Sequence, residues 1–330
     1  MLIYFLNKLR KIFKSIGKKE YLINNLIIYL KFKKKNSNKK ISNKRFKSLC
    51  EKKIKSKPVA VISFLFNEKK IINLKKVCAG LRKISNQIVI YIVINKVNKN
   101  KIKLIKKKLD IRVKIIVIND LPNQRFLPWY QVNIMKKLYK NKTITHFIYL
   151  EDDIFFEEKN FRYWLNSRNI LKKFNLIPGF VRIEKDKKTK RNYAVDIVKK
   201  TKVKDIPRLN IDDKYYFVNN IYPYQGMYIY DRYLMKEYLF GPSSNPDFGN
   251  GSYNPNFIDK RMLDLSLLEK ANIGLTYYNY PKTFFNRIVI PVNIRNKTIS
   301  KVSQIHHLSN NYIKHKNSIF GKINIDDVMQ

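Results

Sequence analysis

The chain has 330 residues, 45% of them hydrophobic, with 22 Tyr and 20 Phe. This composition excludes a wholly disordered chain, and the length suffices for one large folded domain or two small ones. Lys and Arg number 69 against 24 Asp and Glu, which gives a formal net charge of +45. We therefore expect anionic partners: nucleotide phosphates, acidic lipid headgroups or nucleic acid.

Cysteine and histidine are both scarce. Cys50 and Cys78 lie far apart and form no CxxC pair, which favours a reducing compartment and hence a cytoplasmic protein. The 4 histidines leave no room for a zinc site built from several histidines, although mixed Cys and His ligands remain an alternative.

The first 57 residues are predicted to be basic amphipathic helices and a linker. Residues 1–16 place apolar side chains at helical spacing with lysines between them. A second apolar piece, residues 21–32, is shorter than the ~20 apolar residues that span a bilayer. We expect both helices to dock on the anionic cytoplasmic face of a membrane; packing on the folded domain is the alternative. Residues 33–57 lack periodicity and are expected to be a solvated linker.

Strand-like and helix-like segments alternate from residue 58 to residue 150. Strands are predicted at residues 59–66, 87–95, 113–118 and 146–150, and helices at residues 70–84, 99–109 and 129–139. This order predicts an α/β fold with a mostly parallel sheet flanked by helices. No GxGxxG follows the first strand, and neither GxxxxGKS nor GxxxxGKT occurs, which argues against dinucleotide-binding and P-loop folds.

The strand at residues 146–150 stops at three successive carboxylates, Glu151, Asp152 and Asp153. Adjacent acids repel one another and are costly beside an apolar strand unless a positive group holds them. Mg²⁺ and Mn²⁺ bind carboxylate oxygens and keep positions open for phosphate oxygens. The cluster therefore predicts a site for a metal-bound diphosphate, and a solvated acidic loop is the alternative.

The second half of the chain is predicted to contain one helix and several further strands. The helix covers residues 161–174, the strands cover residues 180–184, 215–220, 226–230 and 284–292, and residues 185–191 form a hairpin turn or surface loop. The aromatic strands at 215–220 and 226–230 are expected to be antiparallel. Residues 241–256 are rich in Gly, Pro, Ser and Asn, and this long loop is a candidate lid over a substrate.

A helix predicted at residues 257–272 carries an acid on its apolar face. At about 3.6 residues per turn, Glu269 falls among apolar residues that include Met262 and Leu265. Burial raises the pKa of a carboxylate toward the range of a general base. Glu269 is therefore a candidate catalytic base, with Asp264 as a second one; pairing of Glu269 with a nearby Lys or Arg is the alternative.

Half of the chain's histidines are adjacent, at His306 and His307. Neutral imidazole is a good ligand for Mn²⁺, and protonated imidazole can bind a phosphate. The pair is therefore a second candidate for a metal or phosphate site, and a structural role is the alternative.

Together these features resemble the glycosyltransferases of the GT-A fold. The resemblance rests on the first strand ending in Asn67 and Glu68, the βαβ series, the acidic cluster on a central strand and the late His pair. It covers residues 58–312 and implies a GT-A-like, mostly parallel central sheet flanked by helices, with a smaller antiparallel portion on the acceptor side. Residues 313–330 are then a C-terminal tail.

The resemblance also implies a metal site. Asp153, with Asp152 beside it, would bind Mn²⁺ or Mg²⁺, while Asp152 and Glu151 would give support through the ribose or metal-bound water. His306 or His307 would complete the site. The cluster departs from the simplest D-x-D pattern because its first residue is Glu, a variation that some GT-A enzymes share.

The activity implied is transfer of a sugar from a UDP- or GDP-linked donor to a hydroxyl of a surface polysaccharide or lipid-linked glycan. Asn67, Glu68 and Asp120, at strand ends, would contact the donor nucleotide. Glu269 would deprotonate the acceptor in an inverting enzyme, whereas a retaining enzyme needs no such base. Both stereochemical outcomes remain open.

Three other interpretations remain. A nucleic-acid-binding protein fits the charge, but lysines are spread over every segment and no RNP-like, zinc-finger or KH signature occurs, so no nucleic acid is expected. A sugar nucleotidyltransferase would share the sheet, but such enzymes usually carry a Gly-rich basic loop after the first strand, which is absent. The third is a non-catalytic, membrane-docked module.

Overall fold

The computed structural model describes residues 56–210, 215–246 and 265–330. The helices predicted within residues 1–32, most of the candidate lid and Asp264 lie outside the described residues. Within the described ranges, none of the helices combines the length and the apolar character needed to cross a bilayer.

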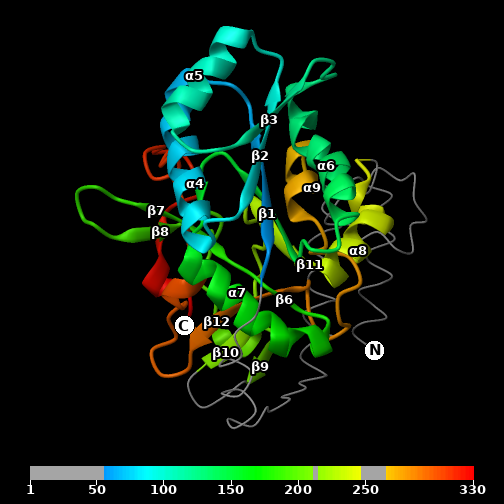
Figure 1. Cartoon of the computed structure of the whole chain (residues 1–330). Coiled ribbons are helices and arrows are strands. Elements are labelled where there is room, and N and C mark those ends of the chain that lie inside the picture. The colour runs from blue at the N-terminus through cyan, green and yellow to red at the C-terminus, as the bar shows by residue number, and fades with distance from the viewer. Residues whose placement is uncertain (1–55, 211–214, 247–264) are drawn as a thin grey trace, which may run out of the picture.

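A five-stranded sheet forms the centre of the molecule (Figure 1). Its order is β11 (Met227–Asp231), β4 (His146–Glu151), β1 (Pro58–Phe64), β2 (Val89–Asn95) and β3 (Lys114–Ile118). Strands β4, β1, β2 and β3 are parallel, and β11 is antiparallel to β4. All 7 residues of β1 are buried, as expected for the central strand of a sheet covered on both faces. The predicted mostly parallel sheet is confirmed.

Helices cover both faces of this sheet (Figure 1). On one side α4 (Ile71–Ile84) packs against α5 (Lys99–Leu109) and α7 (Glu158–Leu171). On the other side α6 (Tyr130–Tyr139) packs against α8 (Arg232–Phe240), and α9 (Leu267–Ile273) packs against the 3-10 helix η2 (Gln124–Trp129). Further 3-10 helices are η1 (Glu68–Lys70), η3 (Lys172–Phe174), η4 (Val203–Asp205), η5 (Pro242–Ser244), η7 (Lys301–Ser303) and η8 (Ile325–Asp327).

Two smaller sheets lie in the second half of the chain. One has the order β6 (Ile177–Pro178), β12 (Ile288–Asn293), β10 (Tyr215–Asn219) and β9 (Arg208–Asn210). The other has the order β14 (Ile323–Asn324), β8 (Asn192–Ala194), β7 (Val181–Lys185), β13 (Gln304–His307) and β5 (Ile154–Phe155). Strand β10 is antiparallel to β9 and β12, and β7 forms the expected hairpin with β8. The parallel pairs β6–β12 and β7–β13 make this portion mixed rather than purely antiparallel.

The elements predicted between residues 58 and 150 are confirmed, because each strand and helix end lies within two residues of its predicted place. Of the helix predicted at residues 257–272, the part from Leu267 onward is confirmed, but residues 265 and 266 are not helical. Ser266 is extended, with ψ of 160°, and caps α9, which begins only at Leu267.

Residues 313–330 belong to the folded domain rather than to a separate tail. Strand β14 pairs antiparallel with β8. Val328 and Met329 are buried in a second hydrophobic core, together with Val181 and Ile183 of β7. The predicted boundary at residue 312 is therefore corrected, and the end of the chain supports the strand β7.

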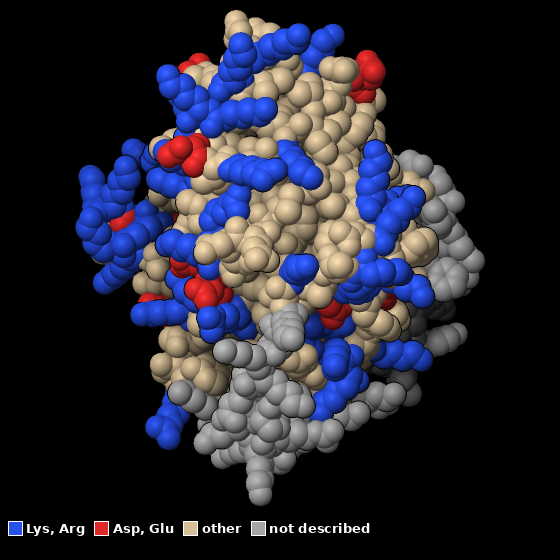
Figure 2. Space-filling model, in the orientation of Figure 1, with Lys and Arg blue, Asp and Glu red and all other residues tan. Residues whose placement is uncertain are grey.

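Lysine and arginine side chains are spread over the whole face of the molecule in Figure 2, where acidic side chains form small separate spots. The net charge of +45 is therefore a property of many elements rather than of one stripe. Such a surface attracts anions at long range without selecting among them.

Arg287 is the basis of a stability prediction, because it is fully buried (0% exposed). Its Nη1 lies 2.9 Å from Glu237 Oε1 on α8, and its Nε donates to the Asn175 carbonyl. Arg287→Met would leave Glu237 without its cation, and we expect the free energy of unfolding to fall by about 3 kcal/mol in urea titrations followed by circular dichroism. Arg295→Met, at an exposed arginine, should change it by less than about 0.5 kcal/mol. Equal effects of the two substitutions would contradict a supporting role for Arg287.

Candidate functional site

The acidic cluster lies at the end of β4. Glu151 is the last residue of this strand, and Asp152 and Asp153 form the turn into β5. Strand β5 pairs with β13, which places His307 opposite Ile154. The Leu308 N–H also donates to the Asp153 carbonyl at 2.8 Å. Pairing of strands that are far apart in the sequence therefore assembles the site.

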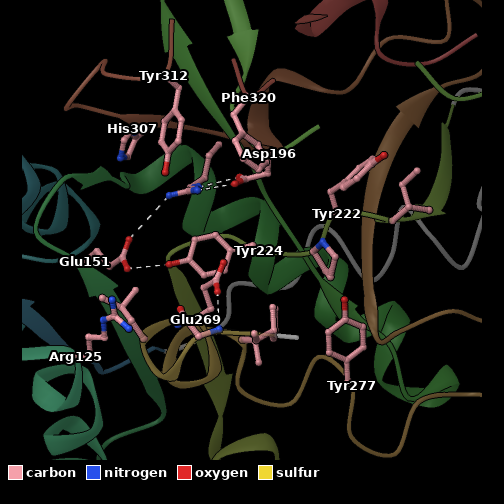
Figure 3. Close-up of a pocket in the computed structure, with 17 residues that line it drawn as sticks. Arg125, Glu151, Asp196, Tyr222, Tyr224, Glu269, Tyr277, His307, Tyr312 and Phe320 are labelled. Atoms are coloured by element: carbon pink, nitrogen blue, oxygen red, sulfur yellow. Dashed lines mark hydrogen bonds and ion pairs between the residues drawn. The ribbon is translucent and has the colours of Figure 1, made fainter. Parts of the chain in front are cut away.

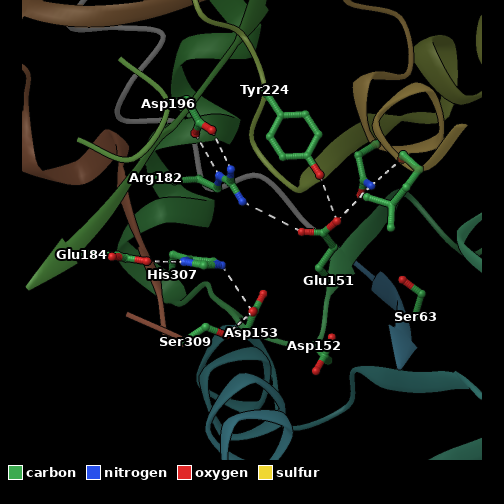
Figure 4. Close-up of polar contacts among 12 residues, drawn as sticks. Ser63, Glu151, Asp152, Asp153, Arg182, Glu184, Asp196, Tyr224, His307 and Ser309 are labelled. Carbon is green, nitrogen blue, oxygen red and sulfur yellow. Dashed lines mark hydrogen bonds and ion pairs between the residues drawn. The ribbon is translucent and has the colours of Figure 1, made fainter. Parts of the chain in front are cut away.

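Asp153 belongs to a chain of polar contacts through His307 (Figure 4). Its Oδ2 lies 3.3 Å from His307 Nε2 and accepts a hydrogen bond from the Ser309 hydroxyl. On the other side of the ring, His307 Nδ1 lies 2.6 Å from Oε1 of the fully buried Glu184. Glu184 Oε2 accepts a further bond from the Ile313 N–H at 2.9 Å. The imidazole is therefore held between two carboxylates.

These contacts shift the pKa values of the groups involved. Burial lowers the pKa of His307, but its hydrogen bonds with Asp153 and Glu184 outweigh this effect and raise the pKa to about 9. Burial raises the pKa of both carboxyl groups, yet the hydrogen bond with His307 leaves each pKa below its usual range. At neutral pH the site therefore holds an imidazolium between two carboxylates.

Glu151 has a different set of partners. Its Oε1 accepts hydrogen bonds from the Tyr224 hydroxyl at 2.9 Å and from the Asn272 side-chain amide at 3.0 Å, and its Oε2 lies 4.0 Å from Arg182 Nη1. Burial and the charge of Asp153 raise the pKa of Glu151 to about 7, although Arg182 acts in the opposite direction. Glu151 is thus a carboxyl group that titrates near neutral pH.

Arg182, on β7, is a fixed positive charge beside Glu151. It is 4% exposed, and its Nε and Nη2 donate to the two carboxylate oxygens of Asp196 at 2.9 and 2.5 Å. The guanidinium also lies over the Tyr224 ring, 4.6 Å from the centroid. This bidentate pairing fixes the orientation of Arg182, so that Nη1 is directed at Glu151 (Figure 4).

Gly226 lies directly against the Glu151 side chain. Its φ is 62°, a conformation that other residues rarely adopt, and a Cβ at this position would lie 2.7 Å from Glu151 Oε2. The Gly226 carbonyl accepts a hydrogen bond from the Glu151 N–H at 3.0 Å. The loop before β11 therefore lies directly against the acidic cluster, and its positive φ favours glycine at this position.

Asp152 points away from Asp153 (Figure 4). It is 8% exposed, and its Oδ2 accepts no hydrogen bond but lies 3.9 Å from Lys70 Nζ. Burial and the neighbouring Asp153 raise the pKa of Asp152, while Lys70 opposes this shift. The site therefore contains a buried carboxylate oxygen that lacks a hydrogen-bond partner.

A cavity of about 630 Å³ lies beside Glu151 and His307 (Figure 3). Its aromatic lining consists of Tyr222, Tyr224, Tyr277, Tyr312 and Phe320. Its charged lining consists of Arg125, Glu151, Arg182, Asp196, Glu269 and His307. Aromatic faces combined with a few converging polar groups are typical of small-molecule sites, and carboxylates accept hydrogen bonds from hydroxyl-rich ligands.

Only one residue of the His pair reaches the site. His306 pairs with Phe155 across β5 and β13, and adjacent strand residues point to opposite faces, so His306 is directed away from the face that carries His307. Burial and the positive charges of Lys159 and Lys185 lower the pKa of His306. Of the two histidines, His307 is thus the one placed to act with Asp153.

The predicted nucleotide contacts lie outside the cavity lining. Asn67 Oδ1 accepts the Lys69 N–H at 2.9 Å and caps η1. Exposed Glu68 forms an ion pair of 3.2 Å with Lys108. Asp120 is exposed after β3. Their contact with a donor nucleotide stays a prediction.

Glu269 lines the cavity, but for a different reason from the one expected. It occupies the first turn of α9, where its Oε2 accepts the Ser266 N–H at 2.8 Å and its own N–H donates to the Ser266 hydroxyl at 3.3 Å. This reciprocal pair is a capping box. Glu269 is therefore a half-buried capping residue at the cavity wall and not an acid on the apolar face of a long helix.

Two of the predicted metal ligands lie together. Among the described residues, no three or more Cys, His, Asp and Glu side chains are gathered as metal ligands. Asp153 Oδ2 and His307 Nε2, however, are separated by 3.3 Å. Neighbouring ligands on an octahedral ion with bonds of about 2.1 Å are ~3 Å apart. This pair is therefore spaced as two ligands of one ion would be.

Sequence reasoning missed Arg182, Glu184, Asp196 and Tyr224. A signal for the first two was present, because Arg182 and Glu184 alternate with Val181 and Ile183 on a strand. Charged residues at alternate positions of a buried strand lie on one face and need partners there. Asp196 and Tyr224 lie in loops and carried no such signal.

No family model matches the sequence, and no curated protein matches it. A protein of Desulfovibrio desulfuricans G20 described as a nucleotide-diphospho-sugar transferase is 9% identical with a TM-score of 0.26, over 40% of this chain and 59% of that one. The chain thus spans less than two thirds of that protein. The 4-diphosphocytidyl-2C-methyl-D-erythritol synthase of Anaerococcus prevotii DSM 20548 is 12% identical with a TM-score of 0.30, over 63% of this chain and 82% of that one. Similarities this low carry no argument about function.

Proposed function

We propose that this protein is a metal-dependent glycosyltransferase of the GT-A type, which moves a sugar from a nucleotide-diphosphate donor to a hydroxyl acceptor. The observation that carries the proposal is the buried acidic cluster at the end of β4, in which Asp153 lies 3.3 Å from His307. Glu151 and His307 also line an aromatic cavity of about 630 Å³. The acidic cluster, which favours a bound cation, therefore lies next to a cavity whose aromatic and polar lining suits a sugar.

The residues present fit Mn²⁺ or Mg²⁺. Asp153 and His307 would hold the ion, and Glu184 holds the other ring nitrogen of His307, as carboxylates do for metal-binding histidines. A cation here would replace the proton that His307 shares with Asp153. When bound, the ion would neutralise charge that develops on the leaving nucleoside diphosphate.

The other acids would position the donor. Asp152 Oδ2, which accepts no hydrogen bond, would accept one from a ribose hydroxyl. Lys70, 3.9 Å from Asp152, would bind a phosphate oxygen. Glu151, oriented by Tyr224 and Asn272, would accept a hydroxyl of the transferred sugar at the edge of the cavity.

The acceptor would occupy the cavity between the aromatic side chains. In an inverting transfer a carboxylate takes the proton of the attacking hydroxyl, and Glu269 on the cavity wall is the residue we propose for this role. The acceptor class remains the one expected from the sequence, a surface polysaccharide or lipid-linked glycan, handled in the cytoplasm.

The proposal predicts metal-dependent binding of a nucleotide. With UDP or GDP at a hundredfold excess over the dissociation constant and Mn²⁺ present, we expect stabilisation by roughly 2.7 kcal/mol, seen as a rise in melting temperature. Asp153→Asn should remove the Mn²⁺-dependent part of the rise. A rise that persists without metal and in this variant would refute the assigned metal site. A rise with CTP alone would favour nucleotidyl transfer.

A second prediction concerns Glu184, which touches His307 but does not line the cavity. Glu184→Gln weakens the acceptor that orients His307, and we expect Mn²⁺ affinity to fall about 10- to 100-fold in calorimetric titration. Glu158→Gln, at a half-exposed acid of α7 that pairs with Arg162 and does not contact His307, is the matched control and should leave the affinity unchanged. Equal affinities for both variants would show that His307 does not bind the ion.

A third prediction separates the two roles of Glu269. Glutamine also forms a capping box, so Glu269→Gln should keep α9 folded while removing the base. We expect kcat for nucleoside diphosphate release in the presence of acceptor to fall about 10²- to 10⁴-fold. Ser266→Ala, which weakens the cap but keeps the carboxylate, should change kcat far less. If only Ser266→Ala lowers kcat, Glu269 serves as a cap alone.

A further inference from the structure

Two large aromatic side chains on α8 are strongly exposed to water. Tyr233 is 70% exposed and Phe240 is 76% exposed, more than any other large apolar residue in the described ranges. They are seven residues apart, so they lie on the same side of the helix, ~10 Å from one another. Apolar side chains gathered on one exposed face indicate a binding surface.

Five exposed lysines lie on α8 and on or directly after α6, the helix that packs against it. They are Lys136 and Lys137 of α6, Lys140 and Lys142 directly after it, and Lys236 of α8. The only acid within α6 and α8 is Glu237, which is occupied by Arg287 at 2.9 Å. This face is therefore positive without compensation from its own helices.

Tyr139 links the aromatic and the cationic groups. Its ring meets the ring of Phe240 edge-on, with centroids 6.2 Å apart. Arg232 and Lys142 lie 4.3 and 5.9 Å from the centroid of the Tyr139 ring. Aromatic and cationic side chains thus meet at Tyr139, and the exposed surface of the two helices, which we call the α6–α8 face, is defined by Tyr139, Tyr233, Phe240 and the five lysines.

A groove of about 530 Å³ adjoins this face. Phe240 and Lys136 lie at the groove, together with Phe126, Trp129 and Leu239. Helix η2 connects it to the candidate site, because η2 contributes Phe126 to the groove and Arg125 to the cavity. A partner on the α6–α8 face would therefore lie close to the cavity.

We propose that the α6–α8 face docks on an anionic lipid bilayer. Aromatic side chains favour the headgroup level of a membrane, and each lysine near the surface adds attraction to acidic lipids. The groove offers apolar space for part of a lipid chain. This docking surface is distinct from the N-terminal segment and does not depend on the proposed reaction.

The test is a tryptophan placed in the proposed contact. Phe240→Trp in the full chain should shift its emission to shorter wavelength and be quenched by brominated lipids in vesicles that contain phosphatidylglycerol. Ile72→Trp, at an exposed position on α4 across the sheet, should not be quenched. The wild-type chain gives the background from the buried Trp129 and Trp164.

The same tryptophan tests whether binding depends on the lysine charges and on acidic lipid. Adding Lys136→Gln and Lys140→Gln to Phe240→Trp should weaken vesicle binding about fivefold for each lysine, and vesicles of phosphatidylcholine alone should not quench. The proposal is overturned if vesicles bind the chain but quench Phe240→Trp no more than Ile72→Trp. It is also overturned by failure to bind vesicles, or by a shift that follows protein concentration without lipid, since a second copy would then cover the face.

Discussion

Three carboxylates side by side at the end of a buried strand are the constraint on which the rest of the site depends. Carboxylates removed from water need compensating charge or hydrogen bonds, and they repel one another when close. The structure gives each a separate partner: Arg182 for Glu151, Lys70 for Asp152 and His307 for Asp153. The three side chains diverge toward these partners, which offset part of the repulsion; burial and the remaining repulsion raise the pKa values of Glu151 and Asp152.

Strand β7 contributes a residue to two of these three pairings. Arg182 and Glu184 lie on the same face of it, so Arg182 reaches Glu151 while Glu184 orients His307, the partner of Asp153. The alternate residues, Val181 and Ile183, are buried in the second hydrophobic core. A shift of one residue would exchange the two faces, placing charges in the core and apolar groups beside the acids. Packing and electrostatics therefore select the same register.

Local periodicity in the sequence predicts which segments are helices and strands. It does not predict which side chains meet across strands that are far apart in the sequence, because that depends on the pairing register. Alternation of strands and helices was sufficient for the sheet from residue 58 to residue 150. It could not show that His307 rather than His306 faces Asp153, because that follows from the pairing of β13 with β5. The misplaced start of α9 is different, since Ser266 followed three residues later by Glu269 is itself a capping-box signature. Met262 and Leu265 share the helical spacing of α9 although they precede its cap, so the spacing alone does not locate the start of the helix.

The basic surface and the acidic site act on an anionic ligand over different ranges. Exposed lysines attract phosphate over about a Debye length, ~10 Å at moderate salt, wherever on the surface they lie. At the acidic cluster the same phosphate would meet carboxylates and be repelled, so surface charge alone cannot bring a diphosphate to Asp153. A divalent cation bound between the carboxylates and the phosphate turns this repulsion into attraction, which is why the proposed function requires one. One chain would thus bind nucleotides in two ways: weakly and with salt sensitivity over its surface, and tightly at the acids only when the metal is present.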